Sequence, residues 1–89
     1  MQTSEPLARI LATGVKPFQV SYSIEIDGRE IARVTGLDTA QDIAMALSKG
    51  VTSIRLRSIP SSATASVLPH ALYFDYETNE WKDELVEAH

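Results

Sequence analysis

The sequence contains no cysteine, and it has only two histidines, four glycines and four prolines among 89 residues. Without cysteine there is neither a disulfide framework nor a thiolate metal site, as is typical of a reducing compartment. Each glycine stands alone, so there is no glycine-rich phosphate-binding loop. Two histidines, His70 and His89, cannot by themselves supply the three or four ligands of a zinc site. We therefore expect neither a metal nor another cofactor.

Long apolar runs are also missing. No segment approaches the roughly 18 consecutive apolar residues of a membrane helix. In the first 14 residues Glu5 precedes any basic side chain, which does not predict a secretory signal. Hydrophobic residues still make up 44% of the chain, an ordinary fraction for a globular protein. The sequence thus predicts one soluble, cytoplasmic domain over residues 1–89.

A short helix is expected at the N-terminus. Ser4 is a suitable N-cap, Pro6 fits the first turn, and Gly14 can end the helix. Aliphatic residues recur on one face at three- and four-residue spacing: Leu7, Ile10 and Leu11. Because so short a helix is marginal alone, we expect this face to cover one end of the core.

An alternating segment then predicts a half-buried antiparallel strand. Its inward-facing residues would be Phe18, Val20, Tyr22, Ile24 and Ile26. Asp27 and Gly28 form a typical tight-turn pair, and the partner strand is expected from Ile31 to Thr35. Together these segments predict a β-hairpin.

A central helix should follow Gly36, with Asp38 as its N-cap and Gln41 as the capping-box partner. Its inward stripe would consist of Ala40, Ile43, Ala44 and Leu47. Lys49 and Gly50 are typical of a helix end, because a cation there faces the negative end of the helix dipole.

The second half of the chain predicts further strands. Val51 to Ile59 alternates again, and Pro60 ends this third strand. The small-residue connection that runs on to Pro69 shows no periodicity and is expected to be mobile. A fourth strand is predicted from Ala71 to Tyr76.

The last segment has two interpretations. Thr78 and Asn79 suit a turn, after which Glu80 to Lys82 would return as a short fifth strand with Trp81 across from Tyr76 or Phe74. The alternative is a C-terminal helix from Trp81 to Ala88. With the first interpretation, the fold class is α+β: a short N-terminal helix and an antiparallel sheet of four to five strands, with one central helix packed on one face.

Catalytic motifs are missing from the sequence. No Gly-x-Ser-x-Gly elbow is present, and His70 is interpreted as a loop residue rather than a general base. Paired carboxylates occur only in a polar segment. General acid–base catalysis needs one carboxyl group of such a pair to have its pKa raised by burial, and we do not expect burial in this segment. We therefore do not expect an enzyme.

The charge is unevenly distributed. Residues 1–74 carry 7 basic and 6 acidic side chains, a net +1, whereas residues 75–89 carry 6 acidic side chains and one lysine, a net −5. Four of the six aromatic residues lie in or beside that acidic segment. Acidic and aromatic residues together favour contact with a protein partner that has a basic surface. The candidate partner-binding residues are Asp75, Glu77, Glu80, Trp81, Asp83 and Glu84. The alternative is a solubilising tail with Tyr76 and Trp81 in the core.

Three arginines form an opposing candidate. Arg55 and Arg57 share one face of the third predicted strand, and Arg33 is expected nearby, so the three could grip phosphate groups. A pI near 5.0 disfavours nucleic-acid binding, however. Cross-strand pairing with nearby acids explains these arginines better: Glu25, Asp27 or Glu30.

The run from Ile31 to Ile59, with the helix opening Leu37 to Ala44 and the later segment Leu72 to Trp81, resembles a plan found in small phage proteins. Among these, anti-CRISPR inhibitors are similar in size, acidity and lack of a catalytic motif. This resemblance implies a protein that blocks a CRISPR surveillance complex by occupying a basic or guide-facing surface. HicB-family antitoxins are also similar, with a β-β-α-β core and a helix start like Gly36 to Asp42, but this sequence lacks their appended DNA-binding segment.

The sequence therefore predicts a small non-enzymatic binding protein that inhibits or regulates a larger complex through protein–protein contacts. Two alternatives remain. One is a structural domain that self-associates as a homodimer, and the other is a small nucleic-acid-binding or antitoxin-like regulator.

Overall fold

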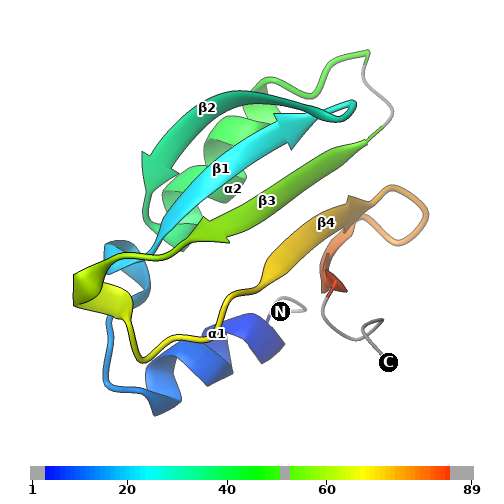
Figure 1. Cartoon of the computed structure of the whole chain (residues 1–89). Helices are drawn as coiled ribbons and strands as arrows, with labels where there is room; N and C mark the ends of the chain where they lie inside the picture. The colour runs from blue at the N-terminus through cyan, green and yellow to red at the C-terminus, as the bar shows by residue number, and fades with distance from the viewer. Residues whose placement is uncertain (1–3, 51–52, 85–89) are drawn as a thin grey trace.

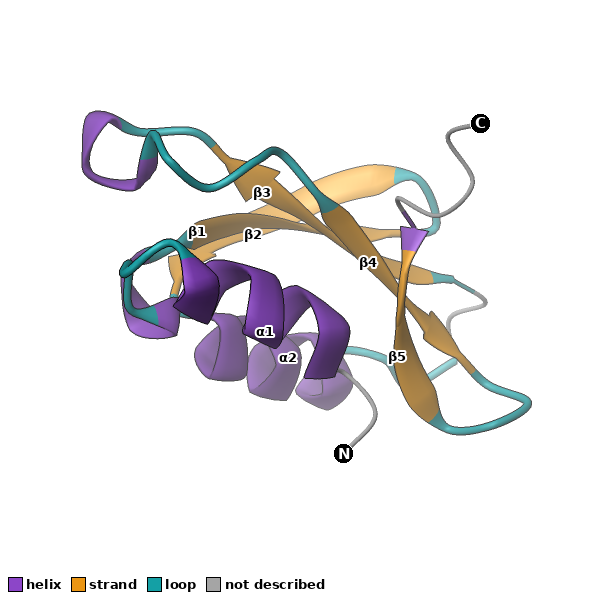
Figure 2. Cartoon of the chain, turned by 90° about the horizontal axis from the view of Figure 1, so that it is seen from below, coloured by secondary structure: helices purple, strands orange, loops and turns teal. Residues whose placement is uncertain are grey.

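A computed structural model describes the chain over residues 4–50 and 53–84. Five antiparallel strands form one open sheet in the order β2-β1-β3-β4-β5. Both helices lie on the same side of the sheet, apart from each other, with α2 behind β1 and β2 in the view of Figure 1 and α1 below them (Figures 1 and 2). The helices are α1 (Ser4–Ala12) and α2 (Leu37–Ala46), with 3-10 turns η1 (Pro17–Gln19) and η2 (Ser62–Thr64). The strands are β1 (Ser21–Ile26), β2 (Arg29–Thr35), β3 (Ile54–Ile59), β4 (Ala71–Asp75) and β5 (Glu80–Asp83). The α+β prediction is confirmed.

The β1–β2 hairpin forms at the predicted turn. Asp27 and Gly28 both have positive φ, 51° and 86°, which matches the right-handed twist of the strands that they join. The hairpin register shifts between Ile24 and Glu25, and the extra, unpaired residue of this bulge is Ile31 on the edge strand β2. On its other side β1 pairs with β3, so β1 is an interior strand whose apolar face is buried.

Phe18 does not join this strand, contrary to the alternating pattern. Its side chain is 67% exposed because Pro17–Gln19 forms η1 and β1 begins only at Ser21. Pro17 fixes its own φ in a turn conformation, and the Gln19 side chain accepts a hydrogen bond from the Lys16 N–H at 3.1 Å. These local interactions override the strand period.

The central helix differs from the prediction at both ends. Its N-cap is Gly36, with φ 107°, and Asp38 lies in the first turn without capping it. The last helical residue is Ala46, four positions before Gly50. Leu47 therefore lies beyond the helix and is exposed rather than part of the inward stripe.

The core lies between the helices and the sheet. α2 packs against β1, β2 and β3, and α1 contributes one fully buried side chain, Ile10. The buried apolar residues are Ile10, Val20, Tyr22, Ile24, Leu37, Ala40, Ala44, Ile54, Leu56, Leu72 and Trp81. The radius of gyration is 12.3 Å, close to the roughly 12 Å expected of a compact domain of this length. None of the helices described here is long and apolar enough to cross a membrane.

The β4–β5 hairpin is confirmed. Asn79 takes the left-handed conformation (φ 59°), and Phe74 pairs with Trp81. The helical interpretation is wrong for residues 81–83, and its remainder over residues 85–88 lies outside the described residues. The connection between β3 and β4 contains η2 and buries Thr64, although its mobility stays a prediction.

Candidate functional site

The six predicted partner-binding residues do not share one surface. Trp81 and Asp83 lie two residues apart on β5 and therefore face the helices together. Trp81 is buried, and the Asp83 side chain is only 5% exposed. The Asp83 carboxylate accepts a hydrogen bond from Arg9 of α1 at 2.5 Å. Asp83 therefore ties the N-terminal helix to β5, and neither the Trp81 nor the Asp83 side chain is exposed for contact with a partner.

Two further acids are paired on the opposite, open face of the sheet. Glu84 accepts a hydrogen bond from Arg55 at 2.8 Å, and Asp75 lies 3.2 Å from the Lys82 ammonium. The pKa of Asp75 is lowered chiefly by the backbone N–H of Glu77, and then by Lys82. Both carboxylates are therefore engaged within the fold.

The end of the β4–β5 hairpin keeps the exposed acidic and aromatic groups. We call residues Asp75 to Glu80 the acidic hairpin end; it carries three carboxylates and no basic side chain. Tyr76 is 43% exposed, and its ring meets Phe74 edge-to-face at a centroid distance of 5.1 Å. Phe74 in turn meets Trp81 at 5.3 Å, so Tyr76 is the outer member of an aromatic row that starts in the core.

Arg55 and Arg57 of the open face pair across strands, as predicted, whereas Arg33 pairs within its own strand. Arg55 and Arg57 each lie 3.0 Å from a different oxygen of Glu25. Arg33 donates to Glu30 at 2.7 Å. The pKa of Glu30 is lowered first by this bond and then by one from Ser23, and the pKa of Arg55 is raised chiefly by its bond to Glu84. Asp27 instead accepts from the Ser53 N–H at 3.0 Å.

A buried histidine is the main feature that the sequence missed. His70 lies in the connection before β4, as predicted for a loop residue, but its side chain is buried and its Nε2 is 2.7 Å from the Tyr22 hydroxyl. Its Nδ1 lies 3.0 Å from the Leu68 carbonyl oxygen, which can only accept. In the neutral ring Nδ1 therefore donates, and Nε2 accepts from Tyr22. A signal existed: a tyrosine inside an apolar strand face needs a partner for its hydroxyl.

The backbone of His70 is held as firmly as its ring. Its N–H donates to Ser58 Oγ at 2.9 Å, and its carbonyl accepts from the Ser58 N–H at 2.9 Å. Both ring nitrogens being engaged, the geometry favours a structural imidazole over a general base.

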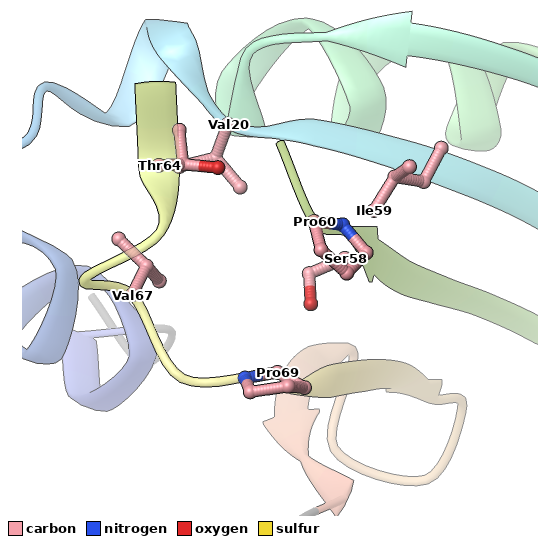
Figure 3. Close-up of a pocket in the computed structure, with 7 residues that line it drawn as sticks. All are labelled: Val20, Ser58, Ile59, Pro60, Thr64, Val67 and Pro69. Carbon is pink, nitrogen blue, oxygen red and sulfur yellow. The ribbon is translucent and has the colours of Figure 1, made fainter. Parts of the chain in front are cut away.

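Hollows surround the connection that leads to His70. One, of about 10 Å³, lies between the connection and the ends of β1 and β3. Figure 3 shows Val67 across from Ser58, with Thr64 beside Val20. A second, of about 140 Å³, lies between α1 and the connection. A third, open hollow of about 270 Å³ lies on the sheet face beside Arg55, Arg57 and Glu84. His70 borders the second and the third.

Among the residues that the structure describes, no three His, Cys, Asp or Glu side chains gather around a point that could hold an ion. Searches of protein-family models, curated proteins and solved structures found no match to this chain.

Proposed function

We propose that the chain is a small non-enzymatic binding protein that inhibits or regulates a larger complex through protein–protein contacts. The contact surface is the acidic hairpin end, and its partner carries a basic surface. The resemblance to small acidic phage inhibitors favours a nucleic-acid-binding complex of the CRISPR type as that partner. The absence of cysteine from the sequence favours a cytoplasmic location.

The observation that carries this proposal is the exposure of Tyr76 in a segment that holds three acids and no basic side chain. Glu77 is exposed beside it and Glu80 is half-buried, whereas most acids of the open face lie against arginines. Tyrosine is enriched at protein interfaces because its ring buries a large area at a low cost in side-chain entropy. Carboxylates around such an anchor steer a basic partner toward it and set orientation.

Both alternatives have observations against them. Nucleic-acid binding would require Arg55 and Arg57 to leave Glu25, and the acids of the open face would repel phosphates. Self-association through the free edge of β2 is opposed by the bulge at Ile31 and by the charges of Arg29 and Glu30, devices that discourage edge-to-edge pairing.

The test compares two pairs of charge reversals that change the net charge equally. The full chain is used to capture a complex from a lysate of its source organism, and the affinity of the purified complex is then measured for each variant. Glu77→Lys with Glu80→Lys alters the acidic hairpin end, whereas Asp38→Lys with Asp42→Lys alters exposed acids of α2.

We expect the hairpin reversals to weaken binding at least tenfold and the α2 reversals to change it less than threefold. Binding should also weaken as salt rises toward about 0.5 M, because exposed charge pairs are screened. Equal affinity of both double variants would contradict the proposed surface. Capture that vanishes after nuclease treatment would favour the nucleic-acid alternative.

A further inference from the structure

We infer that the hollow between α1 and the β3–β4 connection is a binding site for a small, uncharged, single-ring or similarly sized apolar compound. We call it the α1 hollow, and its lining residues are Arg9, Thr13, Ser66, Val67, Leu68 and His70. This site is separate from the acidic hairpin end and does not depend on the proposed function.

The size of the α1 hollow sets the size of the ligand. Its volume is about 140 Å³. An engineered apolar cavity of about 150 Å³ in another protein binds benzene. The hollow therefore has room for one six-membered ring with a small substituent, and it is too small for a nucleotide or a folded peptide.

The electrostatics of the lining favour a neutral ligand. Arg9 is the one lining residue that is always charged, and the Asp83 carboxylate lies 2.5 Å from its guanidinium. The His70 ring offers no free nitrogen in its neutral form, because Tyr22 and the Leu68 carbonyl engage both. A charged ligand would lose its hydration without gaining an uncompensated counter-charge.

The lip of the hollow offers apolar surface that a ligand would cover. Leu68 is 70% exposed, the largest exposure among the large hydrophobic residues that the structure describes. The bond from His70 to the Leu68 carbonyl fixes the backbone there, so the exposed side chain stands on a held segment. Val67 is partly buried and packs against the core on the inner side. An apolar ring in the hollow would lie between these two side chains.

The walls of the hollow are held from several directions. The Thr13 hydroxyl donates to the Ile10 carbonyl at 2.6 Å and thereby fixes the end of α1. Arg9 ties the same helix to β5, and Tyr22 ties the floor residue His70 to β1. A hollow with held walls loses little conformational entropy when a ligand enters, which raises affinity for a small compound.

The experiment titrates the ¹⁵N-labelled full chain with phenol and follows the amide resonances by NMR. Benzoate, with the same ring and a negative charge, is titrated in parallel. Val67→Phe is designed to fill the hollow, and Leu68→Ala removes the lip without disturbing a buried position. Leu47→Ala is the matched control, because Leu47 is an exposed leucine that does not line the hollow.

We expect saturable shifts at Thr13, Val67, Leu68 and His70 with a Kd of about 1 mM, as is usual for a ligand of this size. Benzoate should bind at least tenfold more weakly, Val67→Phe should weaken phenol binding at least tenfold, and Leu68→Ala about threefold. Leu47→Ala should leave the affinity unchanged. If Val67→Phe fails to fold, Leu68→Ala still tests the site, because a substitution at this exposed position should leave the fold intact.

Three results would overturn the inference. The first is the absence of saturable shifts at the hollow up to the solubility limit of phenol, and the second is benzoate binding as tightly as phenol. The third is tighter binding of N-acetylphenylalanine amide than of phenol, which would assign the hollow to a side chain of a protein partner.

Discussion

The Tyr22 hydroxyl and the His70 ring are joined inside the protein by a hydrogen bond of 2.7 Å, with the two rings edge-to-face at a centroid distance of 5.5 Å. Tyr22 lies on β1 and His70 precedes β4, and β3 lies between these two strands. The bond therefore spans a strand and links parts of the sheet that share no backbone ladder.

Alkaline pH should weaken the fold through Tyr22. Burial raises the pKa of Tyr22 well above its ordinary value of 10.0. Above pH 10 the unfolded chain loses this proton while the folded chain keeps it, so the free energy of unfolding falls as pH rises. The slope from this group is about 1.4 kcal/mol per pH unit. Urea unfolding between pH 8 and about 11 measures it.

Tyr22→Phe separates this effect from other titrations. Near pH 7 the variant should lose about 1–2 kcal/mol, because His70 Nε2 loses its buried donor. Above pH 10 the variant should lose less stability per pH unit than the parent. Tyr76→Phe, at an exposed tyrosine, is the control and should leave the free energy of unfolding near pH 7 almost unchanged. If the free energy of unfolding fell equally steeply with pH in Tyr22→Phe and in the parent, the buried Tyr22 hydroxyl would not be the cause of the alkaline loss of stability.

The Arg9–Asp83 pair should matter more than the ion pairs of the open face. Because the Asp83 side chain is almost inaccessible, Arg9→Met leaves its carboxylate short of a counter-charge and should cost about 1–3 kcal/mol. Arg33→Met breaks a solvent-exposed pair with Glu30 and should give a much smaller change. Thermal unfolding of both variants tests this order. An equal loss of stability in the two variants would show that the contact between Arg9 and Asp83 stabilises the fold no more than the exposed pair does.

Gly36 should tolerate substitution less well than Gly14. Gly36 is buried, with φ 107° and ψ 126° at the start of α2, a conformation that side-chain-bearing residues rarely adopt. Gly14 has φ 85°, nearer the left-handed well, and open space around its Cα. We expect Gly36→Ala to cost about 2–3 kcal/mol and Gly14→Ala about 1 kcal/mol. Denaturant midpoints compare them, and a reversed order would contradict the assigned strain.

Local patterns predicted most of the fold because its strands alternate cleanly and its turns carry Asp-Gly and Thr-Asn pairs. The errors came where neighbouring residues override periodicity. Pro17 and Gln19 make a 3-10 turn that removes Phe18 from β1. The central helix ends at Ala46. Leu47 is therefore exposed, although it has the spacing of the inward-facing residues.

The candidate site was less predictable because its pairings are non-local. Arg9 and Asp83 lie 74 positions apart, and Tyr22 and His70 lie 48 apart. Part of the answer was present in the sequence, since period two places Asp83 on the same side as a core Trp81. The sequence pattern does not show which side chain would donate a hydrogen bond to the Asp83 carboxylate. That donor is Arg9, and its position depends on where α1 docks.

The contact between α1 and β5 also orders the events of synthesis. Ribosomes make α1 first, yet the carboxylate that holds it is added 74 residues after Arg9. The β1–β2 hairpin and α2 are synthesised before that point, whereas the bond between Arg9 and Asp83 can form only after β5 has been synthesised. Until then the Arg9 side chain lacks the carboxylate that it meets in the folded protein.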